Sequence, residues 1–306
     1  MNPTLPKRRT RVALPPVPSQ VTGGIRYRRA VRAASTGLSY VGLVLLALLV
    51  LIPLWWVMVS SFTTRETVWA NVLPFNFRAF LPAEFTLAAY QEIFARGFGR
   101  AISNTLLVGF VTVVLTILIC AMAGFAFARF EFRGKSTIWV LVLLTLMVPS
   151  ELTVIPSYTL VSTFGWVNSW AALIVPAVGN ATAIFLFRQF FAGIPQDLFD
   201  AARVDGATWG RVFRNIVLPL SRPVMVTSGI LIFLGQWNSF FWPMLVAPDA
   251  SYRQIQVAVA MIGVDQELSS WDLIFASATI AAVVPLLLVL PLQRFYVSSI
   301  MGSGIK

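Results

Sequence analysis

Two short stretches of the sequence contain residue types that could act on a phosphate or an acyl group. Gly134-Lys135-Ser136 resembles the end of a phosphate-binding loop, where a lysine and backbone N–H groups hold phosphate oxygens. The first glycine of such a loop belongs at position 129, which is Arg129. Ser303 and Lys306 have the spacing of a serine–lysine nucleophile pair, but they lie in the last four residues, where nothing could preorganise them. Neither an ATP site nor a nucleophile is therefore predicted, and we expect a protein without enzymatic activity of its own.

Histidine is absent from the sequence and cysteine occurs once, at Cys120. This composition excludes histidine-ligated metal sites, histidine-based catalytic triads, disulfide frameworks and paired redox cysteines. No metal or cofactor is expected in this chain. Cys120, Gly124 and Ala128 instead place small residues four positions apart, a spacing that permits close packing of helices.

The overall composition is that of an integral membrane protein. The 306 residues are 58% hydrophobic and 11% charged, with a mean hydropathy of +0.79, whereas soluble domains are about 25% charged. A bilayer-spanning helix needs about 20 apolar residues. We predict an all-α protein with six transmembrane helices, which fall at Ala33–Thr64, Ala101–Ala128, Ser136–Ser150, Ala171–Phe190, Pro223–Pro248 and Leu273–Gln293. The uncharged residues after Glu151 are expected to form an outer loop or a re-entrant turn.

The distribution of basic residues sets the orientation. With the N-terminus in the cytoplasm, 18 of the 23 Lys and Arg residues fall in inner segments, as the excess of cytoplasmic positive charge in membrane proteins requires. Both termini are therefore predicted to be cytoplasmic, and the positive charge is not attributed to nucleic acid binding. Residues 1–35 are basic, rich in proline and free of acidic residues. They are expected to form a disordered arm that sets topology or attracts anionic lipid, followed by a membrane domain over residues 36–306.

The inner segment between the fourth and fifth spans has the pattern of a helix–turn–helix. Pro195 can begin a helix, Asp205-Gly206 forms a turn, and a second helical stretch ends at Pro219. Phe199 and Phe213 contribute to an apolar side. From the residues alone, this segment could equally be an amphipathic helix lying on lipid headgroups.

The same segment resembles the EAA loop of ABC import permeases. The shared pattern is acid-Ala-Ala, three residues, Gly, nine residues, Ile-x-Leu-Pro, which here is Asp200, Ala201, Ala202, Gly206, Ile216, Leu218 and Pro219. Asp200 replaces the usual Glu and retains its charge. Weaker similarity runs in order from about Ser39 to the end of the chain and indicates the MalG-like, carbohydrate-importer branch. We refer to residues 195–220 as the EAA loop.

The resemblance implies the function of a permease subunit in the bacterial cell membrane. In that family the EAA loop sits in a cleft of a dimeric cytoplasmic ATPase, which binds the ATP and Mg²⁺. Asp200, Ala201, Ala202, Asp205 and Gly206 would thereby couple ATP-driven closure to the membrane helices. The resemblance also implies a second, related permease subunit and an extracytoplasmic solute-binding protein, and it suggests that the C-terminal tail, residues 302–306, reaches the ATPases.

Polar and aromatic residues near the spans are candidates for the solute pathway. We predict roles for Trp237, Asn238, Phe241 and Glu151, because aromatic faces stack on sugar CH groups while amides and carboxylates bind hydroxyls. For any single aromatic residue, an aromatic belt at the membrane interface is the simpler explanation. Since no basic residue lies deep in a span, a sugar, glycoside or polyol fits better than an anion. A glycerophosphodiester or other osmolyte, or a partnerless channel or scaffold, remains an alternative.

Overall fold

In the computed structural model, the described residues are 19–69, 72, 76–81, 84–264 and 270–292, and every regular element among them is helical. The chain divides into two compact units, Met1–Trp56 and Val57–Lys306. Outside the helices named below, one 3₁₀ turn spans Phe77–Phe80. The C-terminal tail and the first 18 residues, for which roles were predicted, lie outside the described residues.

The first unit consists of most of α1, which runs from Ser19 to Ser60. Residues 35–60 of this helix are long and apolar enough to cross a membrane. The helix begins inside the segment expected to be an irregular arm. All the prolines of that segment precede Ser19, so the part that follows carries no residue that prevents helical hydrogen bonding.

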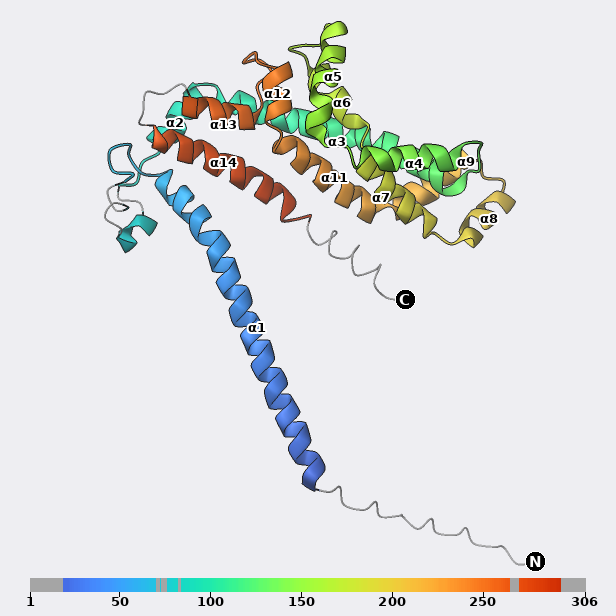
Figure 1. Cartoon of the computed structure of the whole chain (residues 1–306), viewed down its shortest axis with the longest axis horizontal. Coiled ribbons are helices and arrows are strands. Elements are labelled where there is room, and N and C mark those ends of the chain that lie inside the picture. Colours follow the sequence, from blue (N-terminus) through green and yellow to red (C-terminus); the bar gives the residue numbers. More distant parts are fainter. Residues whose placement is uncertain (1–18, 70–71, 73–75, 82–83, 265–269, 293–306) are drawn as a thin grey trace, which may run out of the picture. The chain divides into compact units, whose positions relative to one another are not determined.

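The second unit is organised around α3, which extends from Phe98 to Arg129. This helix packs against α6 (Trp170–Val178), α7 (Ala181–Ala192) and α11 (Arg222–Trp237). Figure 1 shows α8 and α9 at one end of α3, and α2 and α13 at the other. With 32 residues, α3 is about 48 Å long.

Gly124 sets the closest approach between α3 and α7. A Cβ at this position would lie 2.6 Å from Phe187 Cβ and 2.9 Å from the backbone nitrogen of Arg188. Four residues earlier, the buried Cys120 faces the backbone of Val178 and Asn180, where α6 passes into α7. The close packing expected from these small residues is therefore confirmed.

Sharp bends interrupt three of the helical paths. α4 (Lys135–Thr145) meets α5 (Ser150–Thr163) at 103°, α6 meets α7 at 41°, and Trp209–Leu220, the second part of the EAA loop, meets α11 at 74°. If each bent pair is one span, the described residues contain up to six apolar spans, which agrees with the number predicted. The residues that follow Glu151, predicted as an outer loop or re-entrant turn, form the helix α5.

The fifth predicted span, Pro223–Pro248, is wrong as a single helix. α11 ends at Trp237, and a separate helix, α12, covers Phe241–Val246. Pro243 has no N–H to donate to the carbonyl four residues earlier, and its ring would clash there. The side chain of Asn238 donates to the Leu234 carbonyl at 2.9 Å, which satisfies one of the last carbonyls of α11.

The far end of the second unit carries α2 (Ala88–Ala95), α13 (Ile255–Val264) and the start of α14 (Trp271–Val289). Ile93, Phe98, Ile255 and Leu273 are buried there together with Trp237. Asn104 of α3 donates to the carbonyls of Ser251 and Arg253 at 2.9 and 3.0 Å. The loop before α13 is therefore fixed to α3.

Enlarging Gly124 tests whether this contact limits the packing of α3 on α7. We expect Gly124→Ala to destabilise the protein by about 1–3 kcal/mol, because backbone atoms of α7 cannot give way as a flexible side chain would. Gly235→Ala in α11 is the matched control, since a Cβ there meets nothing within 4 Å. Thermal unfolding of the purified protein in detergent measures both variants, and equal midpoints would contradict the packing described here.

Candidate functional site

The EAA loop forms two helical segments joined by a glycine turn. α8 covers Gln196–Val204 and begins directly after Pro195. Gly206 has φ +74°, a left-handed conformation that side chains with a Cβ rarely adopt. The turn that the sequence predicts at Asp205-Gly206 is therefore present.

The second segment is longer and less regular than the sequence predicts. It comprises α9 (Trp209–Val212), a π-helical turn (Phe213–Val217) and α10 (Leu218–Leu220). Pro219 lies inside α10 rather than ending the helix, and the bend toward α11 follows it. Proline has no N–H to donate to the preceding turn, and the π turn, which in proteins occurs mostly as a single-turn bulge within an α-helix, lies just before it.

One face of the EAA loop is buried in an aromatic cluster. Phe199 and Ala202 of α8 pack with Phe125 of α3 and Phe191 of α7. The Phe125 ring lies 5.2 Å from the Phe213 ring and 6.2 Å from that of Trp209, centroid to centroid. Val212 and Val217 are also buried in this cluster, and Ile216 and Leu218 lie at its edge. The loop is therefore part of the helical core of the second unit.

Arg129, the last residue of α3, ties α8 to the membrane helices. Its guanidinium donates to the carbonyl of Phe191 in the last turn of α7, to the carbonyl of Ile194 between α7 and α8, and to Gln196 Oε1 at 3.1 Å. The same guanidinium lies 4.1 Å from the centroid of the Phe199 ring, a cation–π contact worth about 0.5–2 kcal/mol. One side chain thus fixes both the entry to α8 and its buried face.

The opposite face of α8 is exposed and carries acidic and apolar side chains. Asp200, Ala201 and Asp205 are exposed, and Val204 keeps 87% of its surface accessible. Gln196 donates to Asp200 Oδ1 at 3.0 Å, one helical turn away. The two alanines of the motif have different surroundings, because Ala202 is buried and Ala201 is exposed. Pro219 is also exposed.

The four predicted pathway residues differ in their surroundings. Trp237 is 1% exposed and donates its indole N–H to the Ala281 carbonyl of α14 at 2.9 Å, so its side chain packs the bundle. Asn238 and Phe241 are exposed at the break between α11 and α12. Glu151 is exposed near the start of α5, where Ser150 donates to it at 3.2 Å. The described residues contain no group of three or more His, Cys, Asp or Glu placed to hold a metal ion.

Sequence reasoning assigned Arg129 only to the cytoplasmic positive charge and missed its structural role. The sequence offers one weak signal, because Arg129 and Phe130 directly follow an apolar span. In the structure, Phe130 contacts Trp209 of the EAA loop. Nothing in the sequence, however, relates position 129 to residues 191–199. The anchoring function of Arg129 depends on contacts distant in the chain.

Comparison with known proteins defines the class. The family described as "Binding-protein-dependent transport system inner membrane component" matches residues 120–301, and the chain belongs to this family. It is 30% identical to the arabinooligosaccharides transport system permease protein AraQ of Halalkalibacterium halodurans, over 87% of this chain and 95% of the relative. It is 29% identical to the sn-glycerol-3-phosphate transport system permease protein UgpE of Brucella melitensis biotype 1, over 89% of this chain and 98% of the relative.

The fold agrees with this assignment. A chain from the crystal structure of a bacterial ABC transporter involved in the import of the acidic polysaccharide alginate superimposes with a TM-score of 0.76 at 20% sequence identity. The match covers 88% of this chain and 98% of the other. The protein is therefore a multi-pass inner-membrane permease component of an ABC transport system, as the EAA resemblance implied.

Removing the guanidinium of Arg129 tests its role as the anchor of α8. We expect Arg129→Ala to speed amide hydrogen exchange in residues 195–206 by roughly 5- to 100-fold, since hydrogen bonds to charged groups contribute about 1–3 kcal/mol. Arg133→Ala is the control, because Arg133 is exposed and has no such contacts. Unchanged exchange in Arg129→Ala, measured by mass spectrometry, would show that the aromatic cluster alone holds the helix.

Proposed function

We propose that this chain forms half of the translocation pathway of an ATP-driven importer and receives the force of ATP hydrolysis through its EAA loop. The family membership supports the transport role. One structural observation carries the coupling role: α8 of the EAA loop exposes Asp200, Ala201 and Val204, while its other face, with Phe199 and Ala202, is packed into the helices of the second unit.

Such a two-faced arrangement suits the transfer of movement. The exposed face can bind a cytoplasmic ATPase dimer that holds ATP and Mg²⁺, with Asp200, Ala201 and Asp205 on the contact surface. The buried face passes any displacement to α3 and α7 through Arg129 and Phe125. A switch between inward- and outward-facing states requires the ATPase to hold the loop differently in its two conformations, because equal affinity for both states shifts nothing.

The remaining partners follow from the same function. One permease chain would enclose half of a pathway, so we propose pairing with a second, related permease and delivery of solute by an extracytoplasmic binding protein. Six spans with both termini in the cytoplasm would place the EAA loop on the inner side, where an ATPase dimer could bind it. Residues 36–306 would make up this permease domain.

For the transported solute we propose a sugar, glycoside or polyol. No Lys or Arg lies between Arg100 and Arg129 in α3, after Arg222 in α11, or within α14, so these helices offer no cation to an anionic solute. Asn238 and Phe241, exposed at the break after α11, and Glu151 could bind hydroxyl groups and sugar faces. Trp237 would support this surface from within the bundle.

A glycerophosphodiester or related osmolyte is the alternative, since the sn-glycerol-3-phosphate permease relatives match equally well along the chain. In that case the partner permease would supply the positive charge. Mass spectrometry of the solute held by the cognate binding protein distinguishes the two, with a neutral carbohydrate expected and a phosphate ester contradicting the proposed class.

Changing the turn of the EAA loop tests the coupling role. Gly206→Val places a β-branched residue at φ +74°, where each residue with a Cβ is disfavoured by roughly 1–2 kcal/mol or more. We expect solute uptake to fall at least about tenfold while insertion into the membrane is retained. Gly210→Val is the matched control, since neither glycine has a neighbour within 4 Å and only Gly206 has a positive φ. Normal uptake in Gly206→Val would oppose the coupling role.

Val204 provides a separate test of ATPase binding. Its side chain is 87% exposed, so Val204→Glu should leave the aromatic cluster intact while burying a charge in any ATPase contact. We expect the ATPase to be lost from affinity-purified transporter. Val264→Glu, at the similarly exposed end of α13 (82%), should retain it. Retention of the ATPase by both variants would mean that the exposed face of α8 is not the contact.

A further inference from the structure

A cavity of about 380 Å³ lies where α2 ends and α3 begins, at the end of the second unit far from the EAA loop. Arg96, Arg100 and Arg253 line it, and none of its lining residues is acidic. Three arginines around one cavity favour an anion, because the guanidinium group matches the oxygens of phosphate and carboxylate.

The start of α3 adds to the positive potential of the cavity. Gly97, at φ +87°, precedes the helix, and both Gly97 and Phe98 line the cavity. No side chain caps this helix end, and its first turn contains no acidic residue. The first N–H groups of a long helix and its dipole favour a negative group at this position.

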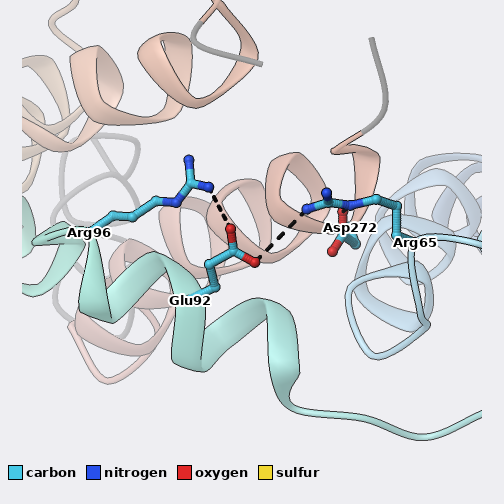
Figure 2. A network of polar contacts seen from close by, with 4 residues as sticks. All are labelled: Arg65, Glu92, Arg96 and Asp272. Carbon is cyan, nitrogen blue, oxygen red and sulfur yellow. Dashed lines mark hydrogen bonds and ion pairs between the residues drawn. The ribbon is translucent and has the colours of Figure 1, made fainter. Parts of the chain in front are cut away.

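The arginines differ in how far they are neutralised. Figure 2 shows Arg96 paired with Glu92, at 2.5 Å, while the other carboxylate oxygen of Glu92 lies 3.9 Å from Arg65. Arg65 also bonds Asp272 at 3.3 Å. Glu92 is therefore shared between two guanidinium groups, and it orients Arg96 at the rim of the cavity.

Arg100 and Arg253 are not neutralised in this way. Among the described residues, neither has a carboxylate within 4 Å. Asp249 attracts Arg253 from a longer distance, while its own carboxylate accepts the Ser251 N–H. The Nε atom of Arg253 is buried and has no hydrogen-bond partner, which is costly for a charged donor unless a ligand supplies the acceptor.

The backbone holds Arg253 in place for such a ligand. Asn104 of α3 donates to the carbonyl of Arg253, and the hydroxyl of Thr105 accepts from Ile255 N–H at 2.8 Å. These two bonds fix the loop against α3, one turn after Arg100. The backbone that carries Arg253 is therefore held against the start of α3.

The position of the cavity favours the phosphate of a phospholipid over a carboxylate of another protein. The cavity lies at the first turn of an apolar span, where headgroup phosphates lie relative to a transmembrane helix. Ile93, Phe98 and Ile262 form an apolar wall beside the arginines. A phospholipid presents this same combination, because its charged phosphate is joined through glycerol to apolar acyl chains.

We propose that this cavity binds a phosphate group, supplied by an anionic phospholipid headgroup of the extracytoplasmic leaflet. Arg100 and Arg253 bind the phosphate oxygens, and the start of α3 contributes its N–H groups and dipole. A bound headgroup would brace α2, α3 and the loop before α13 against one another. This site is separate from the EAA loop and from the pathway residues of the proposed function.

The test uses the assembled transporter in nanodiscs of phosphatidylglycerol and phosphatidylcholine. Native mass spectrometry counts the phosphatidylglycerol that stays bound after extraction. We expect Arg100→Gln/Arg253→Gln to retain at least about tenfold less of it than the unchanged protein, given the strength of hydrogen bonds to charged groups. Arg78→Gln is the control, because Arg78 is exposed and outside the cavity. Arg253→Lys alone should retain part of the binding.

A second arm separates a lipid from a soluble phosphate compound. Thermal stability is measured in phosphatidylcholine nanodiscs with inorganic phosphate or sn-glycerol 3-phosphate, against sodium chloride of equal ionic strength. The lipid source would be overturned if a soluble phosphate compound stabilised the unchanged protein but not the double variant, and if the unchanged protein retained no phosphatidylglycerol. The phosphate would then belong to a soluble compound. Equal phosphatidylglycerol retention by all variants would overturn the site. If the double variant still retains phosphatidylglycerol but its transport is no longer stimulated by the binding protein, the lipid site is overturned and the cavity is a docking surface for that protein.

Discussion

The contact on which the structure depends most is that of Arg129 with the chain entering α8. A single guanidinium at the end of α3 holds two backbone carbonyls, a glutamine side chain and an aromatic ring. These groups belong to residues 191–199, so one side chain joins the longest described helix of the second unit to the EAA loop. Arginine is suited to this role because its planar group donates several hydrogen bonds while stacking on an aromatic face. Lysine could not do both.

The two ends of α3 make contacts with different parts of the second unit. At one end, Arg129 and Phe125 attach the EAA loop. At the other, Asn104 and Thr105 fix the loop before α13, and the cationic cavity lies at the first turn. Between them, Gly124 brings α3 into backbone contact with α7. In the proposed function, this close packing would pass a displacement of the EAA loop on to the helices of the second unit.

Much of the architecture could be predicted from the sequence because apolar runs and small-residue spacing are local signals. The runs located α3, α7 and α14, and the acid-Ala-Ala spacing located the EAA loop. The break at Asn238 could not be found from hydropathy, since residues 223–248 are uncharged throughout, although Pro243 marked it. The residues of α5 follow a bend of 103° and were predicted only as an outer loop or re-entrant turn, and α13 was missed because its ten residues are too short for a predicted span. Trp237 and Asn238 are adjacent in the sequence, but Trp237 is buried and Asn238 is exposed. Their different roles therefore could not be predicted from their adjacency. Arg129 required contacts 62 to 70 residues away.

Cross-linking from the exposed face of α8 tests the central claim most directly. A photoreactive amino acid replaces Leu198, which is 39% exposed, in native membranes, and replaces Phe164, 61% exposed at the end of α5, as the reference position. If the EAA loop is the coupling element, we expect a covalent adduct between position 198 and a nucleotide-binding subunit, and its yield should change when ATP is added. Position 164 should give no such adduct. Adducts of position 198 with lipid alone, in membranes that transport normally, would contradict it.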